Sequence, residues 1–248
     1  MWELIKQIFR NLKFDYWRSS SEKYVTYLRK KGVKIGKNVT FHSPRETIVD
    51  VTQPTLIEIG DNVEITKGVV ILCHDLAWAV QKQLDGDILG CNKSVHIGNN
   101  VFLGINTIIL EGVTIGDNVV VGSGSVVTKE LESNGVYAGV PAKKICSLED
   151  FFSKRKKLQV EEAKELLQSY QKKYRKNPPK ELFRDFFFLF EERSNETAFI
   201  SAYDKILSLG GNKEMSLHKF YTSKPVFAGY ENFLKQCGLG DYEGQKRS

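Results

Sequence analysis

Residues 95–127 read VHIGNNVFLGINTIILEGVTIGDNVVVGSGSVV, and this stretch repeats one short pattern every six residues. An aliphatic residue recurs at every sixth position, usually with a β-branched or small residue two positions before it. An amphipathic α-helix would instead space its apolar residues three and four apart. The repeat therefore favours strands. Its aliphatic positions are Ile97, Leu103, Ile109, Ile115, Val121 and Val127.

Glycine or asparagine also recurs with the same period, three positions after each aliphatic residue. These two residue types tolerate the positive φ that a tight corner requires. Each group of six residues thus predicts a short strand followed by a turn. Strands of fixed period are typical of a parallel β-helix, in which each coil pairs with the next and the aliphatic side chains stack inside. The corner positions are Asn100, Asn106, Gly112, Asn118 and Gly124.

The same pattern occurs upstream, at Ile59, Ile65 and Ile71, and residues 33–41 (VKIGKNVTF) are typical of a first coil. The interval from Ile71 to Ile97 is 26 residues, which is not a multiple of six. The chain must therefore leave the coils as a loop over about residues 75–94. Long loops inserted into a regular scaffold commonly carry function.

The composition is that of a folded chain of 248 residues with a net charge of +6. The positive charge lies in the flanks, because residues 1–32 carry 8 basic and 3 acidic residues, whereas residues 33–147 carry 9 and 12. The four cysteines are scattered, which argues against a zinc ribbon or a disulfide framework and suits a reducing compartment. No run of residues is typical of a membrane span, and no basic–aromatic motif indicates nucleic-acid binding.

The chain divides into three predicted segments. Residues 1–32 favour a helix with a basic side and an apolar stripe (Leu4, Ile5, Ile8, Phe9 and Leu12). This helix is expected to cap the open end of the β-helix core, with contact to a membrane surface as the alternative role. Residues 33–146 form the β-helix. Residues 147–248 form an α-helical extension.

Three sequence signals mark helices in the C-terminal extension. Ser147 is an N-cap residue with Asp150 at the capping-box position. The apolar stretch at residues 181–194 predicts a second helix. Residues 201–211 predict a third, which ends at a glycine.

His74 is the sharpest candidate for catalysis. It comes three residues after Ile71, where the repeat breaks, and so lies at a corner at the root of the loop. Histidine is the side chain that ordinarily exchanges a proton near neutral pH, and a corner histidine beside a loop can act as a general base. Its ring would need a carbonyl or carboxylate to orient it. Asp75 is adjacent in sequence, but adjacent side chains often point apart.

Residues 95–145 strongly resemble the hexapeptide-repeat acyltransferases, within them the sugar O-acetyltransferases such as maltose and galactoside acetyltransferases. The resemblance covers about residues 33–147. The repeat, the histidine-bearing loop and the segment AGVPAKKI, with which the chain leaves the β-helix, occur in the same order as in the family. It implies a left-handed parallel β-helix that forms a homotrimer. It also implies that acetyl-CoA lies between adjacent subunits, and that His74 takes the proton from an acceptor hydroxyl, which attacks the thioester directly.

The resemblance further implies which residues contact acetyl-CoA: Ile105, Ser123, Thr128, Lys129 and Lys143. The two lysines would face the phosphates of the donor. Three positions depart from the family pattern: Phe102 replaces a usual tryptophan, Ile105 a small polar residue and Glu111 a proline. The C-terminal extension is a larger departure, because short members of the family lack it.

The leading hypothesis is therefore a bacterial, cytoplasmic acetyl-CoA-dependent O-acetyltransferase. It would act on a sugar hydroxyl in the synthesis of a cell-envelope polysaccharide, a capsule or O-antigen, with peripheral contact to the inner membrane as an open question. One alternative is N-acylation of a nucleotide-linked amino sugar, and another is a non-catalytic β-helix scaffold. A zinc enzyme like the β-helical carbonic anhydrases needs three convergent imidazoles. Since only His74 and His96 lie in or beside the loop, no metal is expected.

Overall fold

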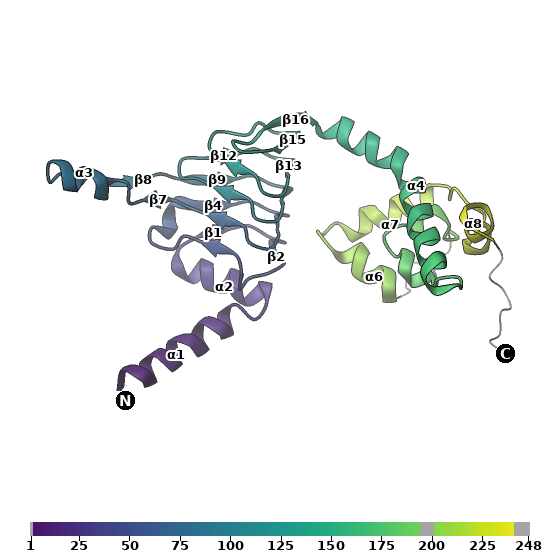
Figure 1. Ribbon diagram of the computed structural model, residues 1–248, viewed down its shortest axis with the longest axis horizontal. Coiled ribbons are helices and arrows are strands. Elements are labelled where there is room, and N and C mark those ends of the chain that lie inside the picture. Colours follow the sequence, from purple (N-terminus) through teal and green to yellow (C-terminus); the bar gives the residue numbers. More distant parts are fainter. Residues whose placement is uncertain (1, 194–200, 241–248) are drawn as a thin grey trace. The chain divides into compact units, whose positions relative to one another are not determined.

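The chain winds repeatedly through three parallel sheets, here called sheets A, B and C, as the computed structural model shows for residues 2–193 and 201–240 (Figure 1). All neighbouring strands in these sheets pair in parallel, except the last pair of sheet B. Sheet A contains β1 (Lys34–Ile35), β4 (Ile57–Ile59), β9 (Val95–Ile97) and β12 (Thr114–Ile115). Sheet B contains β2 (Thr40–Phe41), β5 (Glu64–Ile65), β10 (Val101–Leu103), β13 (Val119–Val121), β15 (Gly135–Ala138) and β16 (Lys143–Ser147). Sheet C contains β3 (Ile48–Val49), β6 (Val70–Ile71), β11 (Ile108–Ile109) and β14 (Val126–Val127).

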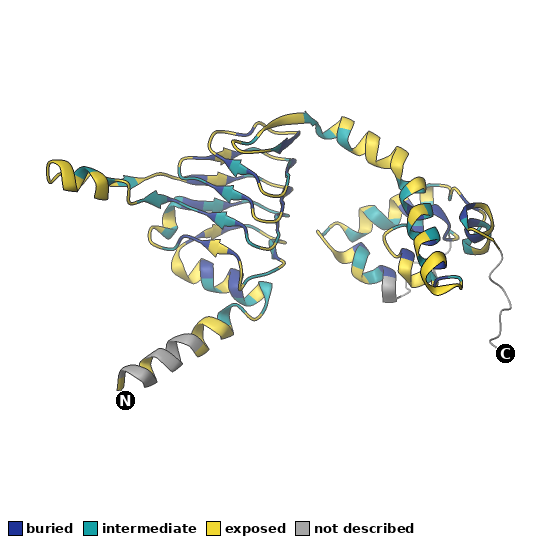
Figure 2. Cartoon of the chain, viewed as in Figure 1, coloured by how far each residue is buried: buried dark blue, intermediate teal, exposed yellow. Residues whose placement is uncertain are grey.

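The recurring aliphatic residues point inward, as predicted. All six of those in residues 95–127 are at most 2% exposed, and they form one continuous core with the matching residues of the earlier coils. In Figure 2 dark blue, buried segments recur along the strands of the coils. This packing confirms the parallel β-helix, because successive aliphatic residues point inward from the three sheets in turn and residues of neighbouring coils, such as Ile97 and Ile115, stack.

The predicted corners are also confirmed. Asn100, Asn106, Gly112, Asn118 and Gly124 all have positive φ, between 55° and 82°. The asparagine side chains stabilise neighbouring corners, since the Asn100 amide donates to Asn118 Oδ1 at 2.7 Å and the Asn118 amide donates to Asn134 Oδ1 at 3.0 Å.

A second glycine position is required by close contact between coils. A Cβ atom on Gly104 would lie 2.5 Å from the Ser123 nitrogen and 2.8 Å from backbone atoms of Gly122 and Val121. These atoms belong to the next coil and cannot move aside independently. The corner between sheets B and C is therefore packed backbone against backbone.

The length of a coil identifies the inserted loop. Ile97 pairs with Ile115, 18 residues later, whereas Ile59 pairs with Ile97, 38 residues later. The extra residues form an antiparallel hairpin of β7 (His74–Asp75) and β8 (Cys91–Asn92) that carries the helix α3 (Trp78–Leu84). Figure 1 shows this loop projecting from the coils.

Two helices precede the first coil. α1 covers Trp2–Trp17 and α2 covers Ser21–Lys31, with a Ser20 cap at its start and Gly32 in the left-handed region at its end. Tyr24 and Leu28 of α2 are fully buried, and the Tyr24 ring packs edge-on against Phe41 of the first coil at 4.9 Å. The side chains of Leu4, Ile5, Ile8 and Phe9, which were expected to form the apolar stripe, lie outside the described ones.

The chain divides into two compact units, Met1–Phe151 and Phe152–Ser248. The long helix α4 (Leu148–Tyr174) crosses the division, and it starts with the predicted capping box, since Ser147 Oγ accepts a hydrogen bond from the Asp150 amide at 3.0 Å. The second unit also contains α6 (Ser201–Ser208), α7 (Lys213–Thr222) and α8 (Tyr230–Cys237), with Gly210 and Gly211 at positive φ after α6, as predicted.

The prediction of a helix over residues 181–194 is wrong. The structure has two short 3₁₀ turns there, η2 (Lys180–Phe183) and η3 (Phe187–Leu189). The phenylalanines of this stretch serve two separate cores, because Phe183 and Phe190 pack with Phe233 while Phe187 packs with Tyr203 and Phe220. A single face of one α-helix could not contribute side chains to both cores. A third 3₁₀ turn, η1 (Pro54–Leu56), lies in the β-helix.

Among the helices of the described residues, we find no segment with both the length and the apolar character that a membrane crossing requires.

Candidate active site

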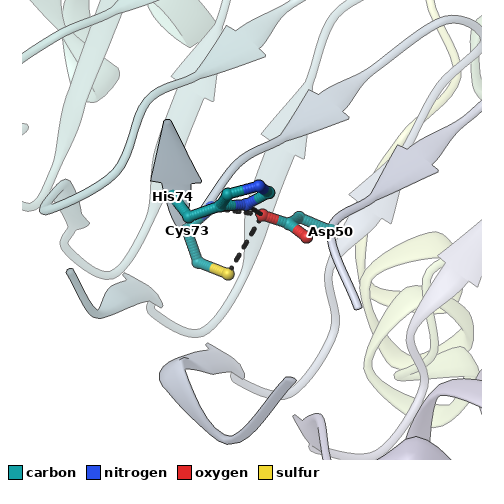
Figure 3. A group of neighbouring side chains, drawn as sticks. All are labelled: Asp50, Cys73 and His74. Carbon is teal, nitrogen blue, oxygen red and sulfur yellow. Dashed lines mark hydrogen bonds and ion pairs between the residues drawn. The ribbon is translucent and has the colours of Figure 1, made fainter. Parts of the chain in front are cut away.

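The candidate catalytic residues follow two neighbouring strands of sheet C. Val49 of β3 pairs with Ile71 of β6, and each strand is continued by polar residues at the corner of the β-helix. Asp50 follows β3 directly, and Cys73 and His74 follow β6 after one residue. The pairing of the two strands thus brings together side chains that are 24 residues apart (Figure 3).

The His74 ring is oriented by the preceding coil. Its Nδ1 donates a short hydrogen bond to Asp50 Oδ2, and Thr52 Oγ1 lies 3.0 Å from the same nitrogen. The Thr52 hydroxyl in turn donates to the other oxygen of Asp50, Oδ1. Because Nδ1 is engaged in this way, Nε2 is the ring nitrogen that can accept a proton from a bound hydroxyl. The sequence did not indicate which carboxylate orients the His74 ring, and in the structure it is that of Asp50.

The charge on Asp50 is strongly stabilised although the side chain is only 8% exposed. Burial raises the pKa of the Asp50 carboxyl, but the hydrogen bonds from Thr52, His74 and Cys73 together outweigh it and hold that pKa well below its usual range. Asp50 is therefore a carboxylate at neutral pH. It can stabilise a positive charge that develops on the His74 ring.

Cys73 completes the cluster as a hydrogen-bond donor. Its backbone N–H and its thiol both lie 3.2 Å from Asp50 Oδ2, and the side chain is fully buried. Burial and the Asp50 carboxylate raise the pKa of the Cys73 thiol to about 11. The thiol is therefore protonated near neutral pH, which makes it a poor nucleophile and a poor metal ligand.

The loop that begins at His74 exposes an unusual amount of apolar surface. His74 and Asp75 pair with Asn92 and Cys91 at the base of the hairpin, so the loop starts from a fixed position beside the cluster. Beyond this base, five aliphatic side chains are between 60% and 76% exposed: Leu76, Val80, Leu84, Ile88 and Leu89. Apolar surface of this kind commonly marks an interaction site.

Four of the five predicted donor-binding residues lie beyond the two ends of the strands of sheet C, and the fifth, Lys143, lies on β16 of sheet B. Thr128 and Lys129 directly follow β14, and His74 comes three residues after Ile71, the last residue of β6, at the same end of the strands. β11 lies between β14 and β6, so about 10 Å separates the ends of these two strands. Lys143 begins β16, and the residue before it, Ala142, donates its N–H to Val126 of β14 at 2.8 Å. All three side chains are exposed.

Ile105 and Ser123 lie instead at the opposite ends of these strands, where the chain enters β11 and β14. The Ile105 N–H donates to Ser123 Oγ at 3.1 Å, and the Ile105 carbonyl accepts from the Gly124 N–H at 2.7 Å. Both backbone groups of Ile105 are therefore used between coils. Its side chain, 46% exposed, is the part that a ligand can contact.

Among the residues that the structure describes, two groups of metal-ligating atoms occur, in each of which the atoms lie within 4.8 Å of one another. One is Asp50, Cys73 and His74, and the other is Asp75, Cys91 and Glu111. The first group has one imidazole and the second has none, so neither provides the three imidazoles of a carbonic anhydrase. His96 lies elsewhere, outward on β9, with its Nδ1 3.5 Å from Glu58.

Comparison with known proteins shows the family of this chain. The family model of the bacterial transferase hexapeptide (six repeats) matches residues 94–129. Protein CapG of Staphylococcus aureus is 44% identical over 128 residues, which are 51% of this chain and 73% of that protein. Galactoside O-acetyltransferase of Escherichia coli (strain K12) is 36% identical over 149 residues, 59% of this chain and 68% of that protein. The chain belongs to the bacterial hexapeptide transferase family. The predicted membership of the hexapeptide-repeat acyltransferases is thereby confirmed.

Two solved acetyltransferase structures also match this chain. A galactoside acetyltransferase in complex with coenzyme A is 29% identical with a TM-score of 0.42, and the match covers 60% of this chain and 84% of that one. A maltose O-acetyltransferase from Clostridium difficile 630 is 27% identical with a TM-score of 0.40, with 58% and 87% covered.

Proposed function

We propose that this hexapeptide transferase moves the acetyl group of acetyl-CoA to a sugar hydroxyl, with His74 as the general base. The observation that carries the proposal is the hydrogen bond from His74 Nδ1 to the Asp50 carboxylate, at the root of the inserted loop. The name of one relative supports the substrate class, because it is a galactoside O-acetyltransferase. The product would be an acetylated sugar of a cell-envelope polysaccharide, such as a capsule or an O-antigen.

The chemistry follows from the protonation of the cluster. His74 Nε2 accepts the proton of the acceptor hydroxyl while the hydroxyl oxygen attacks the carbonyl carbon of the thioester. The tetrahedral intermediate then expels the thiolate of coenzyme A, and the imidazolium returns the proton to that sulfur. No protein nucleophile is needed, because a thioester is already an activated acyl group. The Asp50 carboxylate stabilises the imidazolium between the two proton transfers, as the orienting carboxylate does in other histidine-based sites.

The donor would lie along sheet C. Thr128 lies beyond the C-terminal ends of the strands of sheet C, as His74 does. Ser123 and Ile105 lie before the N-terminal ends of these strands, where the coil corners are exposed. Lys129 and Lys143 are exposed cations that suit the phosphate groups of acetyl-CoA. In this proposal the donor sits between adjacent subunits of a homotrimer of left-handed β-helices. The exposed aliphatic residues of the loop would then cover the neighbouring subunit.

The remaining segments are assigned by the same proposal. Residues 1–32 cap the β-helix, and the burial of Tyr24 and Leu28 in its core supports this role. Residues 33–146 carry the catalytic chemistry, and residues 147–248 are an α-helical extension. The protein would work in the bacterial cytoplasm, in peripheral contact with the inner surface of the membrane through its N-terminal helices.

A direct test incubates the protein with labelled acetyl-CoA and a panel of acceptors: galactosides, capsule or O-antigen repeat units, and nucleotide-linked amino sugars. The proposal expects an ester on a sugar hydroxyl, located by mass spectrometry and removed by mild base. An amide on an amino sugar would show N-acylation instead. Absence of any stabilisation by coenzyme A in a thermal-shift titration would indicate a non-catalytic scaffold.

A further inference from the structure

A groove between the two N-terminal helices combines aromatic and basic side chains. It has a volume of about 500 Å³ and is formed by the end of α1 and one side of α2. Its aromatic rings are Phe14, Trp17 and Tyr27. The other described lining residues are Lys13, Arg18, Lys30 and Lys31, so the described part of the lining is cationic and contains no carboxylate.

The groove is fixed to the first coil of the β-helix from two sides. Tyr24 and Leu28 are buried in the core, which leaves the neighbouring Tyr27 side of α2 facing α1. Arg18, at the end of α1, donates to the carbonyls of Pro44 and Thr47 at 2.6 and 2.7 Å. The rings of Trp17 and Tyr27 lie 5.9 Å apart between these anchors.

Two of these cations, Lys30 and Lys31, lie over the aromatic rings. Lys30 Nζ lies 5.0 Å from the centroid of the Trp17 ring, and Lys31 Nζ lies 5.8 Å from that of Tyr27. A cation–π contact leaves the charge of the ammonium group uncompensated, so it can still attract an anion. Residues 1–32 also carry five more positive than negative charges, which adds to the field at this site.

Large apolar side chains along α1 face solvent. Leu12, Phe14 and Tyr16 are 51% to 59% exposed, and Trp2 is 68% exposed. Tryptophan and tyrosine are enriched at membrane–water interfaces, where the ring enters the apolar region and its polar tip stays wet. Lysines beside them bind anionic headgroups. The combination matches the surface of an anionic bilayer better than a purely apolar protein partner.

We infer that this groove is a docking site for the phosphate headgroups of an anionic phospholipid bilayer. Lys13, Lys30 and Lys31 contact the headgroups, and the exposed aromatic residues of α1 enter the interface beside them. The inference rests on the proposed membrane contact and specifies its residues and its lipid chemistry.

The test is sedimentation of the full-length protein with vesicles of phosphatidylcholine, with or without phosphatidylglycerol. The unmodified protein should bind only the anionic vesicles. The double variant Lys30→Ala/Lys31→Ala should bind them about 25-fold more weakly, at about fivefold per lysine. The double variant Lys156→Ala/Lys157→Ala is the matched control, because it removes two adjacent exposed lysines from α4 and should bind normally.

A second variant separates the apolar from the ionic contribution. Phe14→Ala should weaken binding at every salt concentration, whereas the effect of the lysine variant should fade as salt screens the headgroups. Equal binding to neutral and anionic vesicles, no binding to either, or equal losses in both lysine pairs would overturn the inference. So would a change of oligomeric state in the Lys30/Lys31 variant without lipid, which would assign the groove to a second copy of the chain.

The same proteins are assayed for acetyl transfer to a soluble sugar acceptor. The lysine and Phe14 variants should retain the rate of the unmodified protein. If the unmodified protein binds vesicles but does not transfer acetyl groups, the proposed chemistry is contradicted and the docking site is retained. If it transfers acetyl groups but does not bind vesicles, the docking site is contradicted and the proposed chemistry is retained.

Discussion

Asp50 and His74 lie on neighbouring coils of the β-helix, and their side chains share a hydrogen bond because Val49 pairs with Ile71. The carboxylate is buried and the imidazole is partly exposed at the root of the loop. The scaffold therefore holds the ring with Nδ1 toward the protein and Nε2 available to a substrate. Substitution of Asp50 should reduce the rate of transfer without reducing the affinity for the donor.

The Asp50→Asn variant is expected to lower kcat by about 10²-fold or more, because the ring loses both its orienting acceptor and the charge that stabilises the imidazolium. The KM for acetyl-CoA should stay within about twofold. Steady-state kinetics with both substrates varied would measure this. A variant with unchanged kcat would show that Asp50 has no part in the reaction.

Asp50 should also make stability depend on pH. Its pKa is depressed in the folded protein, so the unfolded chain binds a proton more readily and the stabilisation is present above the unfolded pKa of about 3.9. This stabilisation is lost as the pH falls from about 4 toward the folded pKa. Urea unfolding of the unmodified protein and of Asp50→Asn should therefore give free energies that converge below pH 4. A constant difference between pH 6 and the acid limit would contradict the depressed pKa.

Lys143 and Lys144 offer a matched pair for the donor site. Lys143 is proposed to face the phosphates of acetyl-CoA, whereas Lys144 lies 3.7 Å from Glu132. Lys143→Ala should raise the KM for acetyl-CoA about 5- to 10-fold with kcat unchanged, in line with loss of one charged hydrogen bond. Lys144→Ala should leave both constants unchanged. Equal effects of the two variants would indicate a general effect of charge.

The inward and outward residues of one strand should differ in their contribution to stability. Leu103 is fully buried in the core, and Phe102 beside it on β10 is 41% exposed. Leu103→Ala should lower the free energy of unfolding by about 2–5 kcal/mol. Phe102→Ala should lower it by less than about 1 kcal/mol. Denaturant titration of both variants would check this, and a larger loss at Phe102 would mean that its outer face is buried in an assembly.

The coils and their corners were predictable from the sequence, whereas the partner of His74 was not. A period of six residues states directly which side chains are inside, and Asn106 or Gly112 marks a corner by its residue type. In the first coil, however, Val49 follows Phe41 by eight residues, because a turn at residues 43–46 is inserted. Asp50 is therefore out of phase with the repeat. Its position beside His74 depends on a strand register that no local pattern specifies.

The helical extension shows the same limit. The capping box at Ser147 and Asp150 is a local signal, and the structure confirms its hydrogen bond. The run around Phe187 is apolar enough for a helix, but its rings divide between two cores that are built from distant helices. Tertiary packing decides such a segment, and local propensity does not.

The central claim is that His74 removes the proton from the acceptor hydroxyl. The most direct measurement is the rate of transfer from labelled acetyl-CoA to a sugar acceptor by His74→Ala, with binding of coenzyme A measured on the same sample. The account predicts a loss of about 10²- to 10⁴-fold in kcat with donor binding intact. A variant that transfers acetyl at the rate of the unmodified protein would contradict the account.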